Sequence, residues 1–160
     1  MVRFQTSHGD FAIELFEKES PKSVENFLRY VDEGFFDGTI FHRIVPGFVI
    51  QGGGLTADFK AKKTHPPVTN EAHNKVRNER GTLSMARTND VNSATSQFFV
   101  NLKDNEFLDH KPGSYGYAVF ARVTEGMDVI DRIAGVKTGR RKGYDDAPLE
   151  DVLIVAARRA

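Results

Sequence analysis

The sequence predicts a mainly β fold, a closed eight-stranded antiparallel β-barrel capped by two α-helices. About eight short segments of apolar or alternating residues are separated by turn-forming residues. Only two segments show helical spacing, and strands do not alternate regularly with helices, which argues against a parallel α/β sheet. A closed barrel is favoured because it leaves no strand edge exposed.

The expected strands are all short and rich in apolar residues. They cover residues 2–6, 11–16, 41–45, 48–50, 82–86, 97–101, 116–123 and 152–157. Pro46-Gly47 predicts a tight turn between the third and fourth strands, which would form a hairpin, because proline and glycine are strongly favoured in turns. The glycines at 52–54 are expected to break the second strand of that hairpin.

Two helices are expected. The first begins at Pro21, with Ser20 before it as the capping residue, and ends at Gly34. The second covers residues 125–133, where apolar side chains recur at helical spacing. The intervening loops are polar or charged and are expected at residues 55–81, 87–96 and 137–146.

Composition limits the class of protein. The 160 residues are expected to form one domain, 1–160, since a chain of this length can bury its own core. Its 22 basic and 22 acidic residues balance, which argues against binding to nucleic acid or a membrane surface. The chain has no cysteine, no visible secretory signal and no apolar run long enough to cross a bilayer. A cytoplasmic monomer is therefore the default expectation.

Motifs for most kinds of catalysis are missing. The five histidines do not have metal-ligand spacing with carboxylates. The glycines at 52–54 lack the spacing and the lysine of a phosphate-binding loop, and no nucleophile elbow is present. We therefore expect a function that needs no cofactor, metal or nucleophile.

The predicted hairpin at 41–54 combines an apolar wall with two isolated polar groups. Arg43 and Gln51 lie among β-prone apolar residues, where a cation and an amide are costly unless something uses them. In the later strand QFFVN, alternation sends Phe98 and Phe99 to opposite faces, so one can fill the core while the other lines a pocket. The residues alone predict an apolar pocket with a cation and amides at its rim.

Five ordered motifs resemble the signatures of cyclophilins, a family of peptidyl-prolyl cis-trans isomerases. They are FHRIVPGFVIQGG at 41–53, GTLSMAR at 81–87, SQFFVN at 96–101, FLD at 107–109 and GYAVFARV at 116–123. The likeness spans essentially the whole chain and is greatest to the bacterial cytoplasmic (type B) branch. It implies a cyclophilin-like barrel that isomerises X–Pro bonds. The implied partners are proline-containing peptides and unfolded or flexible protein segments.

The resemblance also implies a site. Its main active-site positions fall on Arg43, Phe48, Gln51 and Phe99. Its further peptide-binding positions fall on His42, Val49, Ala86, Arg87, Gln97, Phe107, Leu108 and Tyr117. Phe107 stands where many eukaryotic members carry Trp, and Phe has no hydrogen-bond donor. At most weak binding of cyclosporin-type cyclic peptides is therefore expected.

The implied reaction suits these residues. Rotation about an X–Pro bond breaks the amide resonance, so the proline nitrogen becomes a hydrogen-bond acceptor that Arg43 is expected to stabilise. Two other functions remain open from the sequence. One is a module that binds proline peptides without turning them over. The other is a structural barrel, which would bury Phe48 and Phe99 and have no surface cleft.

Overall fold

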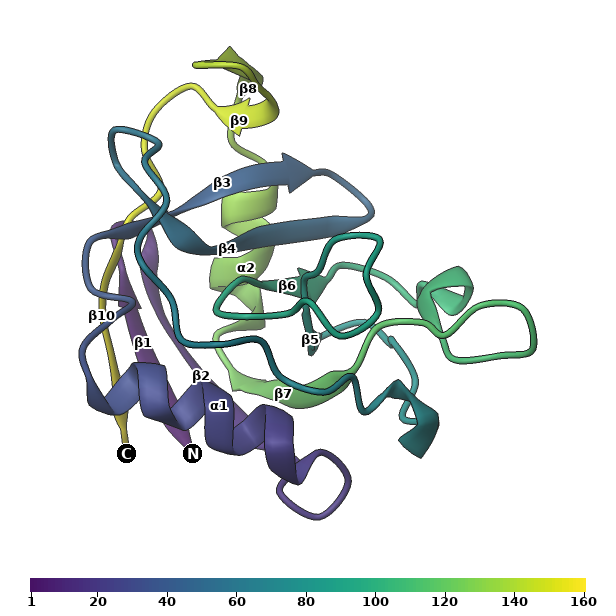
Figure 1. Ribbon diagram of the computed structural model, residues 1–160. Helices are drawn as coiled ribbons and strands as arrows, with labels where there is room; N and C mark the ends of the chain where they lie inside the picture. The colour runs from purple at the N-terminus through teal and green to yellow at the C-terminus, as the bar shows by residue number, and fades with distance from the viewer.

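Ten strands and two helices make up the fold, seen in a computed structural model that describes residues 1–160 (Figure 1). The strands are β1 Val2–Thr6, β2 Gly9–Leu15, β3 Thr39–Val45, β4 Val49–Thr56, β5 Thr82–Met85, β6 Phe98–Asn101, β7 Val119–Glu125, β8 Thr138–Arg141, β9 Tyr144–Pro148 and β10 Ile154–Arg159. Eight of them form one antiparallel sheet in the order β10-β1-β2-β7-β5-β6-β4-β3. The predicted eight-stranded antiparallel barrel with two helices is confirmed.

The barrel is closed between its two outer strands, β3 and β10. The backbone N–H of Phe41 donates to the carbonyl of Val152 at 3.0 Å, and that of Gly38 donates to the carbonyl of Ile154 at 2.8 Å. Ile40 and Leu153 form an antiparallel bridge between these bonds. The closure occupies backbone groups that an open edge would expose.

A hairpin replaces the loop expected at 137–146. Strands β8 and β9 pair through Arg141 and Tyr144, so the turn has only two residues, Lys142 and Gly143. Both turn residues have positive φ, at 47° and 87°. Two successive residues with positive φ are the mark of a turn that matches the twist of paired strands. The loop prediction was wrong here because it weighed charge and overlooked the turn.

Two helices pack on the barrel. They are α1 Pro21–Asp32 and α2 Met127–Ala134, accompanied by 3-10 turns at Ala72–Asn74 and Glu106–Leu108. In Figure 1, α1 runs across the lower end of the barrel. Helix α2 begins later than expected because β7 continues to Glu125 and Gly126 then turns the chain with a φ of 87°.

Glu71 caps the first helix. Ser20 occupies the predicted capping position, but its hydroxyl donates to the carbonyl of Val119 at 2.6 Å. The Glu71 carboxylate instead accepts the backbone N–H of Ser23 at 2.6 Å and that of Lys22 at 3.3 Å. A carboxylate at this end also interacts favourably with the helix dipole. Glu71 is buried, so this part of the segment 55–81, which was predicted as a long surface loop, is packed against the protein.

Aromatic side chains fill the barrel. Phe4 of β1 stacks on Phe11 of β2 with ring centroids 4.7 Å apart. Phe98 of β6 is fully buried and meets Phe27 of α1 edge-on at 5.8 Å. The buried and exposed residues of β1 alternate strictly, as its sequence predicts. This packing ties α1 to the strands that carry the candidate site.

The glycines at 52–54 continue β4 and do not break it, contrary to the expectation. A Cβ on Gly52 would lie 2.6 Å from the carbonyl oxygen of Ile40, and one on Gly54 would lie 2.5 Å from the Gln97 side chain. Glycine is therefore required at these positions, because neighbouring parts of the chain approach the β4 backbone closely. The space beside Gly54 is filled by a residue of the predicted site.

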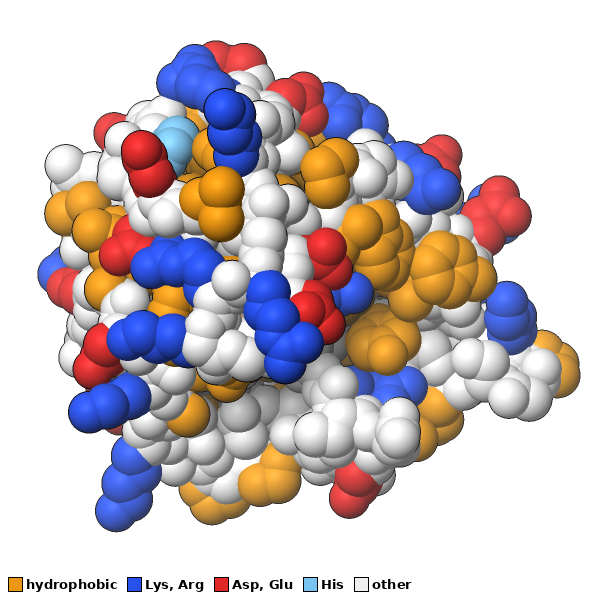
Figure 2. Space-filling model, turned by 90° about the horizontal axis from the view of Figure 1, so that it is seen from above, with side chains coloured by type: hydrophobic (Ala, Val, Ile, Leu, Met, Phe, Trp, Pro, Cys, Tyr) orange, Lys and Arg blue, Asp and Glu red, His pale blue; other side chains and the backbone are white.

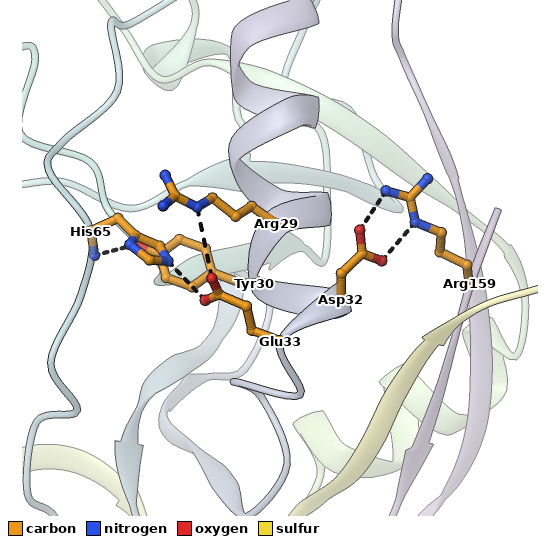
Figure 3. A network of polar contacts seen from close by, with 6 residues as sticks. All are labelled: Arg29, Tyr30, Asp32, Glu33, His65 and Arg159. Carbon is orange, nitrogen blue, oxygen red and sulfur yellow. Dashed lines mark hydrogen bonds and ion pairs between the residues drawn. The ribbon is translucent and has the colours of Figure 1, made fainter.

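An ion pair and hydrogen bonds fasten the end of α1 to neighbouring segments (Figure 3). Asp32 receives two hydrogen bonds of 2.7 Å from Arg159 of β10. Glu33, just past the helix, lies 2.7 Å from the ring of His65. The backbone N–H of His65 donates to the Tyr30 hydroxyl at 3.1 Å. Helix α1 is thereby held to the last strand on one side and to the 55–81 segment on the other.

None of the helices is both long enough and apolar enough to span a membrane.

Candidate active site

A small hollow of about 160 Å³ lies on the outer side of β4 and β6. Nine residues line it, and all nine belong to the predicted site: Arg43, Phe48, Val49, Gln51, Ala86, Arg87, Phe99, Leu108 and Tyr117. Figure 2 shows apolar side chains gathered on part of the upper face with basic side chains among them. The sequence thus predicted which residues come together at this surface.

Strand pairing places three of the lining residues side by side. Arg43 of β3 lies opposite Gln51 of β4, and Gln51 lies opposite Phe99 of β6. Neighbouring strands are about 4.8 Å apart, so a cation, an amide and an aromatic ring follow one another across the sheet.

A β-bulge determines the direction of Arg43. In a regular strand Phe41 and Arg43 would share a face, because they are two residues apart. In β3, however, Phe41 pairs with Gly52 and Arg43 with Gln51, so β3 carries one residue more than β4 over this interval. Phe41 consequently lies in the core, while Arg43 borders the hollow. Bulges often redirect a side chain in this way.

A chain of amide groups continues from Arg43. Its Nη1 lies 3.5 Å from Oε1 of Gln51, at the long end of hydrogen bonding. Nε2 of Gln51 donates to Oε1 of Gln97 at 3.0 Å. The Arg43 guanidinium carbon lies 5.9 Å from the centre of the Phe48 ring. Most of the guanidinium donors therefore remain free for a ligand.

The floor of the hollow is apolar. Val49, Phe99 and Leu108 form a buried cluster separate from the main core, and Phe48, Ala86 and Tyr117 pack around it. Phe99 is only 4% exposed, whereas its neighbour Phe98 points into the barrel. The prediction that these two rings face opposite sides is confirmed. Such a floor suits a small apolar ring like that of proline.

Arg87 forms the far wall. Its guanidinium carbon lies 4.4 Å from the centre of the Tyr117 ring. Nε and Nη2 donate to the carbonyl of Gly116 at 3.3 Å and 3.0 Å, and Nη1 donates to that of Thr88 at 2.9 Å. The side chain is therefore held in one orientation beside the hollow.

Three predicted residues do not line the hollow. Gln97 stands behind Gln51 and contacts it through the amide bond described above. Phe107 is 57% exposed and stacks on Phe48 with centroids 5.5 Å apart, which places it at the rim. His42 is buried beneath the surface, and its ring packs edge-on against Tyr144 of β9 at 5.8 Å. The structure thus places His42 outside the lining of the hollow, and its membership of the peptide-binding set stays a prediction.

The environment of His42 keeps it neutral. Its side chain is 4% exposed, and its Nδ1 has no hydrogen-bond partner within the chain. Burial, with a smaller contribution from the charge of Arg43, lowers the pKa of His42 from 6.5 to about 4. A ring that is uncharged near neutral pH and does not line the hollow is a poor candidate for proton transfer there.

Three buried asparagines, which sequence reasoning missed, connect the walls of the hollow. They are Asn78, Asn101 and Asn105, each at most 1% exposed. Nδ2 of Asn105 donates to the carbonyl of Phe48 at 3.0 Å and to Oδ1 of Asn101 at 2.9 Å. Nδ2 of Asn101 donates to Oδ1 of Asn78 at 3.3 Å. Nδ2 of Asn78 donates to the carbonyl of Leu108 at 3.2 Å.

This asparagine network joins segments far apart in the sequence. The carbonyl of Leu108 also accepts the N–H of Tyr117 at 2.9 Å, so the network reaches three lining residues. Buried amides need partners, and here the Nδ2 groups find them in one another's oxygens and in the backbone of the site. An amide inside the apolar strand QFFVN was the available signal.

The hollow has no carboxylate among its lining residues. No cluster of three or more potential ligands in the chain could hold a metal ion. The arrangement provides a fixed cation, an amide and an apolar seat, which suits binding and polarising a neutral amide.

The barrel and this hollow define a cyclophilin. The family model described as "Cyclophilin type peptidyl-prolyl cis-trans isomerase/CLD" matches residues 1–159. The chain therefore belongs to the cyclophilin-type peptidyl-prolyl cis-trans isomerases, and both the resemblance and the enzyme class expected from the sequence are confirmed.

The chain is similar to bacterial proteins over nearly its full length. Peptidyl-prolyl cis-trans isomerase cyp18 of Streptomyces antibioticus is 54% identical over 160 residues, covering 98% of this chain and 96% of the relative. Peptidyl-prolyl cis-trans isomerase B of Escherichia coli (strain K12) is 52% identical over 157 residues and covers 96% of each. A crystal structure of a Cryptosporidium parvum cyclophilin, obtained in the presence of the dipeptide Ala-Pro, has a TM-score of 0.80 at 26% identity. That alignment covers 98% of this chain and 96% of the other.

Proposed function

We propose that the chain accelerates rotation about X–Pro bonds in peptides and folding proteins, with Arg43 stabilising the twisted amide. The observation that carries this proposal is the placement of Arg43 beside an apolar floor built around Phe99. Membership of the isomerase family supports the reaction. The peptide-binding roles of the other lining residues belong to the same proposal.

The physical difficulty of the reaction is amide resonance. The barrier to rotation is about 18–20 kcal/mol, and uncatalysed X–Pro exchange takes roughly tens to hundreds of seconds. In the twisted amide the proline nitrogen recovers its lone pair and accepts a hydrogen bond. An interaction made only in that state lowers the barrier, whereas equal binding of both states does not.

Arg43 suits this role. A guanidinium remains charged at all accessible pH values and carries several donors. The nearby apolar floor excludes water and strengthens the electrostatic contact. Phe99 and Leu108 would hold the proline ring while the preceding carbonyl turns. Gln51 would position the Arg43 guanidinium and donate a hydrogen bond to a carbonyl of the peptide. No bond is broken, so the proposal requires no nucleophile.

The proposal is tested by exchange NMR on a blocked Ala-Ala-Pro-Phe peptide. We expect a catalytic amount of the protein to broaden or exchange the separate cis and trans signals. A module that only binds proline peptides would shift the signals in proportion to its own concentration without raising the exchange rate, and that result would overturn the proposal.

The natural location and assembly state remain predictions from the sequence. We propose a cytoplasmic monomer, in line with the likeness of the sequence motifs to the bacterial cytoplasmic branch of the family.

A further inference from the structure

Two guanidinium groups border the hollow without a counter-ion. Neither Arg43 nor Arg87 forms an ion pair with any carboxylate of the chain. The lining residues include no Asp or Glu. The chain as a whole has 22 basic and 22 acidic residues, so the positive charge here is a local excess. A concave site with charge of one sign attracts ligands of the other sign.

The two cations lie on opposite sides of Phe99. On one side, Phe99 is paired with Gln51, which is paired with Arg43. On the other side, the Tyr117 ring meets Phe99 edge-on at 5.7 Å, and Arg87 lies over the Tyr117 ring at 4.4 Å. A proline ring seated on Phe99 would therefore have Arg43 at one edge and Arg87 at the other.

Arg87 is already held in place for binding an anion. Its bonds to the carbonyls of Gly116 and Thr88 use three of the five N–H groups of a guanidinium. Two N–H groups remain without a partner in the chain. Because stacking on Tyr117 fixes the plane of the group, little conformational entropy is lost when a ligand binds. A planar fork of N–H donors matches the geometry of a carboxylate.

We infer that Arg87 selects substrates that carry Asp or Glu next to the proline, and that it binds their carboxylate while Arg43 acts on the proline amide. This inference rests on the isomerase function proposed above and names its substrate class. A basic residue at the same position would be repelled by both guanidinium groups. The enzyme thereby favours acidic segments around proline over neutral and basic ones.

Four blocked tetrapeptides test the inference in two pairs: Ala-Glu-Pro-Phe with Ala-Gln-Pro-Phe, and Ala-Ala-Pro-Glu with Ala-Ala-Pro-Gln. Blocking both ends removes the terminal charges. Exchange NMR gives kcat/KM for each peptide, and the Glu-to-Gln ratio within a pair is the readout. We expect a ratio of roughly three- to tenfold in one pair, the range for a charge-assisted bond that is partly exposed. The ratio should fall toward one as ionic strength rises from about 0.01 M to about 1 M, because the Debye length shrinks from roughly 30 Å to 3 Å.

Two variants test whether Arg87 causes the preference for an acidic residue. Arg87→Gln should abolish the ratio, whatever happens to its rate on the neutral peptides. Arg140→Gln removes an equal charge from the exposed hairpin β8–β9, which contributes no residue to the lining of the hollow, and should retain the ratio. A ratio near one in both pairs with wild-type protein, or a ratio that survives in Arg87→Gln, overturns the inference. Turnover of the neutral peptides reports separately on the isomerase function, so the two failures are distinguishable.

Discussion

The side-chain amide of Asn105 donates a hydrogen bond of 3.0 Å to the backbone carbonyl of Phe48. Asn105 is fully buried, while Phe48 is half-exposed at the wall of the hollow. The bond thus connects the interior of the protein to a residue that we propose contacts substrate. Its neighbours in the asparagine network extend the connection to Leu108 and Tyr117.

Asn105→Ala is expected to lower both stability and activity. The substitution leaves buried partners without a donor, which costs about 1–3 kcal/mol of unfolding free energy. We expect kcat/KM on an X–Pro peptide to fall roughly tenfold, below the ~10² cost of a 1 Å misplacement. Urea denaturation and exchange NMR measure the two effects.

Asn74→Ala is the matched control. Its amide donates to the carbonyl of Glu19 in an exposed contact and to the hydroxyl of Ser20 in a half-buried one, and neither partner lines the hollow. This variant should lose stability and keep its kcat/KM. If Asn105→Ala loses stability while its kcat/KM also stays unchanged, the network has only a structural role.

The sequence predicted most of the fold and the site for identifiable physical reasons. Alternation in QFFVN was enough to separate Phe98 from Phe99, because the side-chain period of a strand is fixed. Apolar periodicity likewise placed α1 from Pro21 onward. Of the twelve site residues that the resemblance selected, nine meet at one hollow.

What the sequence could not predict depends on long-range contacts and local backbone geometry. Asn105 and Asn78 carry no local signal, since the carbonyls of the site that they hold, those of Phe48 and Leu108, are distant in the chain. The bulge before Arg43 is a property of strand pairing, not of residue type. The β8–β9 hairpin is charged and exposed, so only the two-residue turn at Lys142-Gly143 could have revealed it.

Gly52→Ala is expected to destabilise the protein. The added methyl group would lie 2.6 Å from the carbonyl oxygen of Ile40 and 2.9 Å from Cα of Phe41, both of which are backbone atoms that cannot move alone. Overpacking of this kind costs about 1–3 kcal/mol. Chemical denaturation should show this loss. In Gly135→Ala the nearest atom lies at 3.6 Å, and the change in stability should stay within about 0.5 kcal/mol. Equal effects for the two variants would show that the glycines of β4 are not sterically required.

His42 should make stability depend on pH without affecting catalysis. Its pKa is lowered from 6.5 to about 4 by burial and by the charge of Arg43. Between these values the unfolded chain binds more protons than the folded one, so the free energy of unfolding falls as the pH falls. Above pH 6.5 His42 is neutral in both states and costs no stability. As the pH falls from 6.5 to about 4, the loss of unfolding free energy reaches something on the order of 3 kcal/mol, at about 1.4 kcal/mol per pKa unit.

Unfolding free energies measured from pH 7 to 4 test this prediction. His42→Gln should flatten the curve relative to wild type, whereas His73→Gln, at an exposed site, should not. Over pH 6–8, kcat/KM should be nearly constant because His42 remains neutral. A steep bell-shaped rate profile would indicate that a titrating group transfers a proton during the reaction.

The central claim is tested most directly by replacing Arg43. Arg43→Ala should lower kcat/KM on an X–Pro peptide by about 10²–10³, the scale for losing one preorganised donor. Arg43→Lys, which keeps the charge but loses the planar fork, should fall between Ala and wild type. Arg140→Ala, at an exposed position on β8, controls for loss of an arginine. If folded Arg43→Ala loses less than about threefold in kcat/KM, far below the scale of a preorganised donor, the twisted amide is not stabilised by this guanidinium.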